Sequence, residues 1–348
     1  MKTFLQALLL SLSAGLCGAA PAQAPEPAVA LTPPEHRRGP EQTFLTYPEW
    51  FLVFSPAELA DTMRTQPPDD FPYFGHIRQF WSGYAQVRQV LRRGGYPFNF
   101  GYHVMIVVIG VSTTAEYALR SLYETLVGRL TALTLHGDST AEDRYAATVQ
   151  QDYVDFIRVL PWYQYDFRGK LAHLWTDTPA WGPHLLRKWE RRYALTSEYV
   201  VKAIYGWIIG KATHATYDKP ILATAVVLDH APAPAGLPEL RVLRTNPDGS
   251  VVALVPRYQA FMQYADALAA QGLQFHEVAG NRGPILVSVL VPDDWRPLGA
   301  QQQVLFSQPV LTAAGSKRVV LTVPVPQLAG LLQQLHAPGV RLEHVFDY

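Results

Sequence analysis

Hydrophobic positions follow two different patterns along this chain, and the change comes near residue 220. Before it, apolar residues recur every three or four positions, which is the period of an amphipathic helix. After it, the apolar runs are short and typical of strands, and only two stretches keep helical spacing. We therefore expect an α+β protein, with a mainly helical domain at 43–219 and an α/β domain at 220–348.

Prolines and capping residues mark the helix ends in the first half. An aromatic run at 44–54 is interrupted by Pro48, and we interpret it as a short extended segment. The sequences Ser55-Pro56-Ala57-Glu58 and Ser139-Thr140-Ala141-Glu142 each combine an N-cap with a glutamate three residues later, which predicts two helix starts. The expected helices cover 56–64, 74–93, 102–135, 140–160, 185–193 and 196–217, and a loop is expected at 162–167.

The second half alternates strands with two helices. The expected helices cover 258–270 and 327–336, and the expected strands cover 221–228, 251–255, 273–278, 285–291, 304–311, 318–323 and 340–346. This order is that of a ferredoxin-like split βαβ unit with an additional hairpin, and a turn at 246–249 leads into its first part. No internal repeat stands out in the sequence.

The first 24 residues have the pattern of an export signal, with Lys2, an apolar run and a small-x-small site at Ala22-Gln23-Ala24. We therefore expect a periplasmic or secreted protein that begins at Pro25, followed by a flexible, Pro- and Ala-rich linker at 25–42. Cleavage would remove Cys17, the chain's only cysteine. The mature chain would then have neither disulfides nor thiolate chemistry.

Composition narrows the classes of ligand. Lysine plus arginine and aspartate plus glutamate both number 29, so no net charge attracts nucleic acid, and we expect none as a partner. The 11 histidines are scattered without a one-turn pair, so we expect no metal site, and no motif indicates a cofactor. All but one of the 8 tryptophans lie before residue 220, which places the candidate ligand-binding residues in the helical domain.

Three constellations carry the candidate residues. Glu116, Arg120 and Glu124 lie one turn apart on one helix face, either as a buried polar site or, as we favour, a solvated salt-bridge ladder. Asp155 precedes the aromatic loop at 162–167, where rings beside acids are typical of carbohydrate sites, although a loop packed into the core is favoured. The residues of this loop taken as candidates are Trp162, Tyr163, Tyr165 and Asp166.

The third constellation is a charged run at 187–192 with a single ring. Its candidate residues are Arg187, Trp189, Glu190 and Arg191. Arginines in such a cluster can bind an anionic ligand through paired hydrogen bonds. A solvated helix face is the interpretation that we favour.

Residues 98–117 are long enough to span a membrane, but only 103–111 is strongly apolar. We favour a helix buried by its neighbours, and peripheral membrane contact stays open. The leading hypothesis is an exported, non-enzymatic protein that binds a small molecule, lipid or protein partner in a ring-lined groove near Glu116, Trp162, Tyr165 and Arg187. The alternative is an envelope hydrolase acting on a sugar or lipid polymer, with carboxylates among Glu116, Asp155, Asp166 and Glu190.

Overall fold

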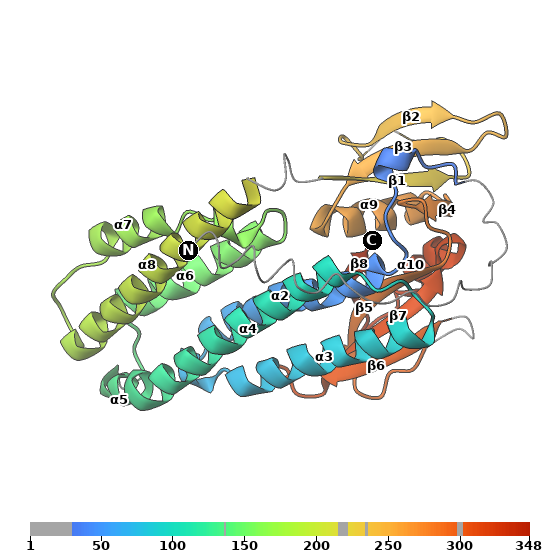
Figure 1. Cartoon of the computed structure of the whole chain (residues 1–348). Coiled ribbons are helices and arrows are strands. Elements are labelled where there is room, and N and C mark those ends of the chain that lie inside the picture. Colours follow the sequence, from blue (N-terminus) through green and yellow to red (C-terminus); the bar gives the residue numbers. More distant parts are fainter. Residues whose placement is uncertain (1–29, 136, 215–221, 234–235, 298–301) are drawn as a thin grey trace, which may run out of the picture. The chain divides into compact units, whose positions relative to one another are not determined.

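A computed structural model describes residues 30–135, 137–214, 222–233, 236–297 and 302–348. The protein is α+β: a helical region with aromatic clusters is followed by two four-stranded antiparallel sheets with short helices (Figure 1). The helices of the first region are α2 (Gln42–Met63), α3 (Tyr73–Arg93), α4 (Phe100–Tyr123), α5 (Arg129–Ala132), α6 (Ala141–Ile157), α7 (Phe167–Asp177) and α8 (Leu185–His214). Short 3-10 turns lie at Pro34–His36, Pro68–Asp70, Leu133–Leu135 and Trp162–Gln164. The export signal and the start of the linker lie outside the described residues.

The first helix corrects the expected extended segment at 44–54. Helix α2 continues through both Pro48 and Pro56, and the predicted N-cap Ser55 lies inside it. Its rings Phe44, Tyr47 and Phe51 are buried against sheet residues, and this packing offsets the hydrogen bonds that the prolines remove. The prolines and the capping pattern therefore predicted a break in the helix, but burial of one aromatic face maintains a single helix.

The other helices follow the predictions more closely. The 102–135 prediction corresponds to α4, a π-helical turn at Glu124–Gly128, α5 and the turn at Leu133–Leu135. The second capping box forms at Thr140 and Asp143, one residue later than expected. The two helices expected at 185–193 and 196–217 are one helix, α8, and residues 215–217 lie outside the described part. Helix α7 begins at the end of the expected loop and was not predicted.

The eight strands form two separate sheets. The first has the order β2-β3-β1-β4 and the second β6-β7-β5-β8, with helices α9 (Gln259–Ala270) and α10 (Leu328–Gln334). The strands are β1 (Ala223–Leu228), β2 (Arg241–Thr245), β3 (Val251–Pro256), β4 (Phe275–Val278), β5 (Pro284–Pro292), β6 (Gln303–Pro309), β7 (Ser316–Pro324) and β8 (Arg341–Phe346). Strand β2, whose residues are all exposed, was not predicted, because it has no buried face to give a pattern.

The two sheets are copies of one topology, a repeat that the sequence did not reveal. In each, three strands precede a helix that leads to a fourth, and the strands on both sides of that helix flank the first strand of the unit. Pro256 pairs with Ala223 and Pro324 with Pro284, and a bulge follows four residues later, at Val227 and Ser288. A second bulge also occurs at matching places, in β2 and in β6. The two sheets therefore share their strand order, their pairing and the positions of their bulges.

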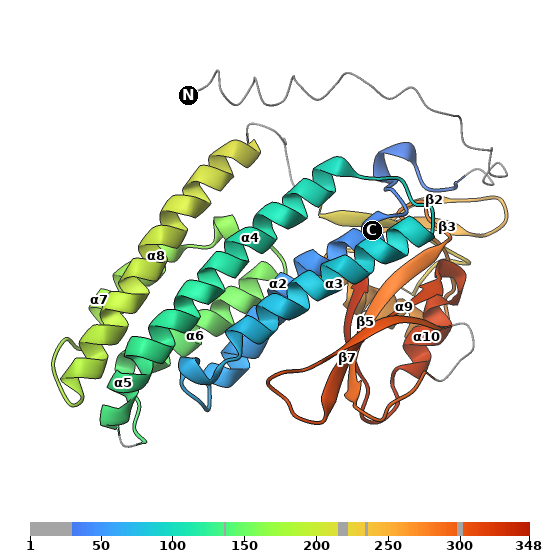
Figure 2. The same ribbon diagram turned by 60° about the horizontal axis from the view of Figure 1, so that its bottom comes forward.

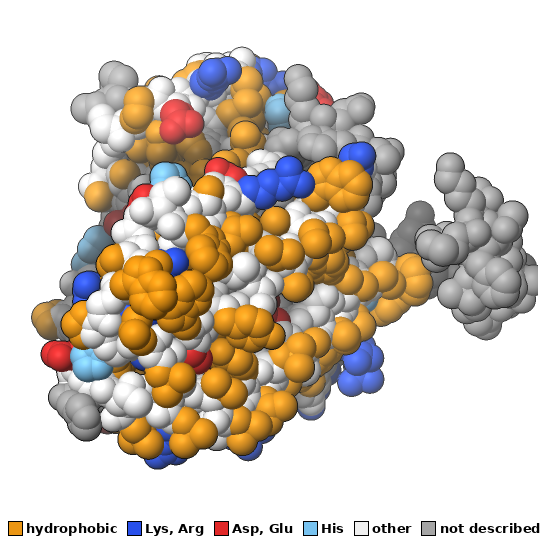
Figure 3. Space-filling model, turned by 90° about the vertical axis from the view of Figure 1, so that its left-hand side faces the viewer, with side chains coloured by type: hydrophobic (Ala, Val, Ile, Leu, Met, Phe, Trp, Pro, Cys, Tyr) orange, Lys and Arg blue, Asp and Glu red, His pale blue; other side chains and the backbone are white. Residues whose placement is uncertain are grey.

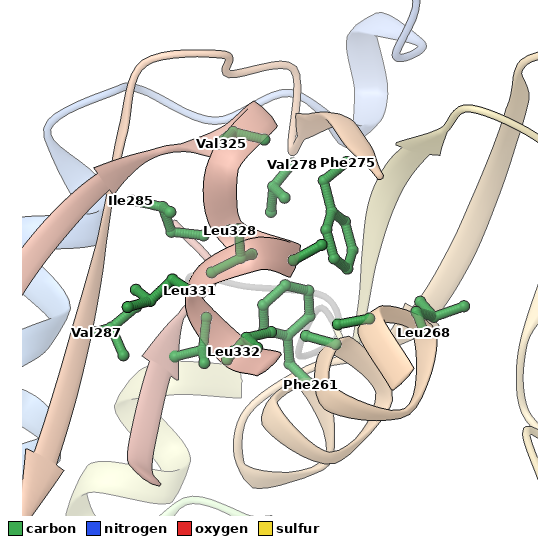
Figure 4. Close-up of a cluster of buried hydrophobic side chains, with 14 of the residues drawn as sticks. Phe261, Leu268, Phe275, Val278, Ile285, Val287, Val325, Leu328, Leu331 and Leu332 are labelled. Carbon is green, nitrogen blue, oxygen red and sulfur yellow. The ribbon is translucent and has the colours of Figure 1, made fainter. Parts of the chain in front are cut away.

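The largest hydrophobic core lies between the sheets. It joins side chains of both sheets with α9 and α10, including Phe261, Phe275, Val287 and Leu331 (Figure 4). The opposite face of the second sheet is covered by α2 and α3, where Leu286 and Val320 pack among aromatic rings. The second sheet is therefore buried on both faces, and it connects the strand region to the helices.

The chain before α2 is held against the first sheet. The backbone N–H and the hydroxyl of Thr32 donate hydrogen bonds to the buried carboxylate of Glu277, at 2.9 and 2.8 Å. The Arg38 backbone N–H donates to the Ala279 carbonyl at 3.0 Å. Residues 31–41, which we expected to belong to a flexible linker, thus make specific contacts, because their buried polar groups find partners at the edge of the sheet.

Candidate interaction surface

Helix α8 buries the charged run at 187–192 and exposes apolar side chains such as Trp189, Val201 and Ile204. The run at 187–192, expected to be a solvated face, is buried except at Trp189, and Arg187 is 2% exposed. Buried charges are costly unless they are paired. This polarity is the reverse of that of a surface helix in a soluble protein.

Each buried cation of this run has an acidic partner. Arg187 donates to Asp143 at 2.8 Å, and Arg191 makes two bonds of 2.9 Å to Glu124. Lys188 and Arg192 share the carboxylate of Glu142. Glu124 lies in the π-helical turn at Glu124–Gly128, and Asp143 belongs to the capping box at the start of α6. A π-helical turn and a helix cap thus position these two acids.

Glu190 joins the cluster from within α8. Its carboxylate accepts hydrogen bonds from Arg187, Arg191, Tyr123 and Thr131. Burial alone would raise the pKa of Glu190, but Arg191 and the hydrogen bonds hold it below the usual range. The same opposition, with Lys188 and Arg192 as the partners, lowers the pKa of Glu142. These acids are therefore ionised in the folded protein.

The first candidate constellation is adjacent and is not a solvated ladder. Arg120 is mostly buried and lies 3.5 Å from Glu198, while Lys202 contacts both Glu116 and Glu198. Burial would raise the pKa of Glu198, but Lys202 and Arg120 lower it to about 2. These pairs join the second half of α4 to the middle of α8.

The aromatic loop is packed mainly into the helical core. Tyr165 is buried against Tyr153 and Phe156, and its hydroxyl donates to Asp152 at 2.7 Å. Trp162 and Tyr163 are half-buried, and Trp162 lies against Tyr205. This packing is the alternative that the sequence favoured.

The loop's acids have local roles. Asp166 is exposed and caps α7 by accepting from the Gly169 N–H at 2.9 Å. Asp155 is exposed and contacts Arg158 on its own helix. The structure thus brings Arg187, Glu190 and Arg191 together, and it gives Asp155 and Asp166 separate partners.

The best-formed hollows are small. In the described part of the chain, the two best each have a volume of about 10 Å³, room for about one water molecule. One is lined by Arg120, Phe167 and Lys202, and neither is lined by Trp162, Tyr165 or Arg187. The exposed rings of the helical region therefore line neither of these two hollows.

The exposed rings and aliphatic side chains instead form a broad surface, which we call the outward face. On the segment from α4 to the turn after α5 they are Val104, Val107, Val108, Val111, Leu119, Leu122, Leu126, Leu130 and Leu133. On α8 they are Leu186, Trp189, Tyr193, Val201, Ile204, Trp207 and Ile208. Figure 3 shows how hydrophobic side chains gather on one side of the helical region.

Few polar groups interrupt the outward face. Among exposed positions at 100–133, only Glu116, Thr125 and Arg129 have polar side chains, and at 185–208 only Ser197 does apart from the tyrosine and tryptophan rings. The two helices run antiparallel, since Ser112 contacts Tyr205 while Gly128 contacts Arg187 (Figure 2). The outward face thus extends along two neighbouring helices.

The burial expected for residues 98–117 is only partly present. The helical segment Phe100–Leu135 is the one described segment long and apolar enough to cross a membrane, and only 22% of its apolar window is buried. Ile106 and Tyr117 face the interior, but Val108 and Val111 are exposed. The expectation was wrong for the outer side because α2, α3 and α8 cover the rest of α4 and leave that side open.

Sequence reasoning named the charged residues of α8 and missed the surface beside them. A signal was present: Leu186, Trp189 and Tyr193 alternate with the charges of 187–192, so one side of the helix must be apolar wherever the charges lie.

Within the described residues, no group of three or more histidines, cysteines or acids could hold a metal ion.

Compared with known protein-family models, curated proteins and solved structures, the chain has no match, so its function has to be argued from its own surfaces and contacts.

Proposed function

We propose that this protein is an exported, non-enzymatic component of the cell envelope that binds a lipid bilayer through the outward face of α4, α5 and α8. The observation that carries the proposal is the reversed polarity of α8. Paired charges such as Arg187 with Asp143 lie inside, while Val201 and Ile204 lie outside. Such an arrangement is stable where the surrounding solvent is apolar.

The composition of the outward face favours lipid over a protein partner. Protein interfaces combine an apolar centre with a polar rim and many direct hydrogen bonds. Here the exposed positions of α8 from 185 to 208 offer only Ser197 as a hydrogen-bonding side chain apart from the rings. Exposed tryptophans such as Trp189 and Trp207 fit the boundary between headgroups and acyl chains.

The neighbouring elements favour a helix pair lying in the plane of the membrane surface. An apolar face from Phe98 to Leu133 extends over about 50 Å of helix, which is longer than the roughly 30 Å hydrocarbon core. Helix α6 exposes Arg144, Asp152 and Asp155, which require water. An amphipathic surface buried about 5–10 Å into one leaflet satisfies both conditions.

The proposal also bears on the hydrolase alternative and on the role of the strand region. The hydrolase alternative draws little support from its carboxylates, since Glu190 is held in ion pairs and Asp155 and Asp166 bond to neighbours along the chain. For the strand region, we propose a docking module built from two related split βαβ units, each with one helix, in place of the single ferredoxin-like domain that we expected. The matching bulges at Val227 and Ser288 support this relationship.

The test is flotation with phosphatidylcholine vesicles. The chain starting at Pro25 is used, because it contains the whole compact unit Leu31–Tyr348 and lacks the apolar signal. We expect it to float with the vesicles and expect Val201→Glu with Ile204→Glu to prevent flotation. The matched control carries Thr148→Glu and Thr176→Glu, at exposed positions of α6 and α7.

Circular dichroism first shows whether each variant is folded, and flotation is compared only among folded proteins. Flotation of the control but not of the α8 variant supports the proposal. If the unmodified chain stays with the buffer and sediments as a stable dimer, the outward face is a contact between copies and the lipid proposal fails. Equal flotation of both variants would also contradict it.

A further inference from the structure

Helix α3 forms one long edge of the outward face. The Trp81 indole N–H donates to the Thr114 hydroxyl at 2.9 Å, and the Tyr84 hydroxyl lies 2.8 Å from His103 Nδ1. A Cβ at Gly110 would meet the Phe80 ring at 2.3 Å, so the two helices approach closely there. Helix α3 is thus packed along the first half of α4 (Figure 2).

The contacts on α4 lie next to its exposed side chains. With 3.6 residues per turn, Val107 and Val111 are the positions on α4 adjacent to the His103, Gly110 and Thr114 row. Both valines are exposed, whereas Ser112 faces α8 on the other side. The outward face is therefore bordered by α3 along one edge and continues onto α8 along the other.

The edge that α3 provides is basic. Arg78, Arg88 and Arg92 are exposed and share one stripe of the helix with Trp81, which contacts α4. The Arg88 guanidinium lies 5.8 Å from the centre of the Tyr84 ring, so it is oriented toward the α4 side. Helix α3 has no aspartate or glutamate.

We propose that this arginine edge binds the phosphates of anionic phospholipid headgroups. The inference rests on the proposed function, because it places the edge at headgroup level beside an immersed apolar face. A guanidinium binds phosphate oxygens through two parallel hydrogen bonds, and the negative surface potential of an anionic bilayer attracts it. The net charge of the chain gives no such preference, so the preference depends on where these arginines lie.

The edge and the outward face have separable effects. Apolar burial acts on any fluid bilayer, whereas arginine contacts act only where the headgroups carry negative charge. Added salt weakens the arginine contacts and does not weaken the apolar burial. Each arginine near the surface is expected to strengthen binding about fivefold, so three together give a preference of about a hundredfold for anionic vesicles.

The experiment compares vesicles of phosphatidylcholine alone with vesicles that also contain phosphatidylglycerol. Three forms of the chain from Pro25 are measured: unmodified, Arg78→Gln/Arg88→Gln/Arg92→Gln, and a control with equal charge loss. The control replaces the exposed Arg144, Arg168 and Arg296 with glutamine, on α6, α7 and the loop after β5.

We expect the unmodified chain and the control to bind the anionic vesicles at least tenfold more tightly, and the α3 variant to bind both kinds with the affinity for phosphatidylcholine. An equal loss in the control would overturn the inference, because total charge would then explain it. An anionic preference that persists in the α3 variant would overturn it too. In both of these outcomes the protein still binds phosphatidylcholine vesicles. If the unmodified chain does not bind phosphatidylcholine vesicles, the proposed function itself is refuted.

Discussion

Helix α8 and the strand region distribute apolar and charged side chains in different ways. In the strand region, Phe261 and Leu331 are buried between the two sheets. In α8, Arg187 and Arg192 are buried, and Val201 and Ile204 are exposed. Arg187 and Arg192 have acidic partners, yet the run at 187–192 lacks the polarity of a surface helix in a water-soluble domain.

This difference separates two sources of stability. Apolar burial stabilises the strand region, whereas α8 is held to its neighbour α6 by buried ion pairs such as Lys188 with Glu142. Buried ion pairs add little net stability compared with apolar packing, but they leave the opposite side of the helices free to be apolar. The exposed face is thus a consequence of where the charges lie.

The largest expected effect contrasts two apolar side chains. Phe261→Ala should destabilise the protein by about 3–5 kcal/mol, because it opens a cavity in the core between the sheets. Ile204→Ala should change stability by less than about 0.5 kcal/mol in vesicle-free buffer, since the side chain is exposed. Urea unfolding measures both. A comparable loss for Ile204→Ala would show that its side chain is buried in solution, and the contrast would fail.

The ion cluster gives the next effect. Glu142→Gln leaves Lys188 and Arg192 buried without a counter-charge and should cost about 3 kcal/mol in urea unfolding. The matched change Asp155→Asn removes an exposed pair with Arg158 and should cost at most about 1 kcal/mol. Equal, small losses would mean that water reaches Glu142 and that α8 does not have reversed polarity.

A pH effect tests the boundary between the two regions. His344 is fully buried against Trp50, and burial lowers its pKa well below the usual value. His76, lying near Glu58 and Arg318, has its pKa lowered to about 3 by burial and then by Arg318. Below about pH 6.5 the unfolded chain binds protons that the folded chain does not, so stability falls with falling pH.

The variant His344→Leu isolates this contribution. The unmodified chain should lose about 2 kcal/mol more than the variant between pH 6.5 and pH 5, measured by urea unfolding at each pH. Burial raises the pKa of Glu49 to about 7, which acts in the opposite direction, but it is present in both chains and cancels. Identical pH profiles would contradict a neutral, buried His344.

The smallest effect compares the two copies within the strand region. Gly272 and Gly339 follow α9 and α10 with φ angles of 87° and 78°. Alanine at either position should cost about 1–2 kcal/mol, because a left-handed conformation disfavours a Cβ. Thermal or urea unfolding should give similar losses for both, and the absence of a loss at either position would contradict a left-handed conformation there.

The sequence predicted the helix-rich and strand-rich halves because hydrophobic period depends on local geometry alone. It failed at α2, where long-range burial of Phe44 and Tyr47 outweighs Pro48 and Pro56. The shared topology of the two sheets was not predicted because its marks, such as the bulges at Val227 and Ser288, are set by strand pairing and not by residue identity.

For the candidate site, the sequence located the charges of α8 but not the direction they face. Periodicity groups Arg187 with Arg191 on one side, yet it does not say which side is solvent. That choice is made by acids far away in the chain, Glu124 and Asp143, which lie on separate elements. The apolar face was therefore read as core.

A single environment-sensitive fluorophore at Ile204 tests the central claim most directly. Cys17 is the chain's only cysteine, so in the chain from Pro25 a cysteine introduced at Ile204, or at Thr148 of α6 as the control, is labelled alone. On addition of vesicles, we predict a blue shift and quenching by lipids brominated in their acyl chains for the label at 204, and neither for the label at 148. Labels that respond alike, or a label at 204 that stays in water, would contradict the account.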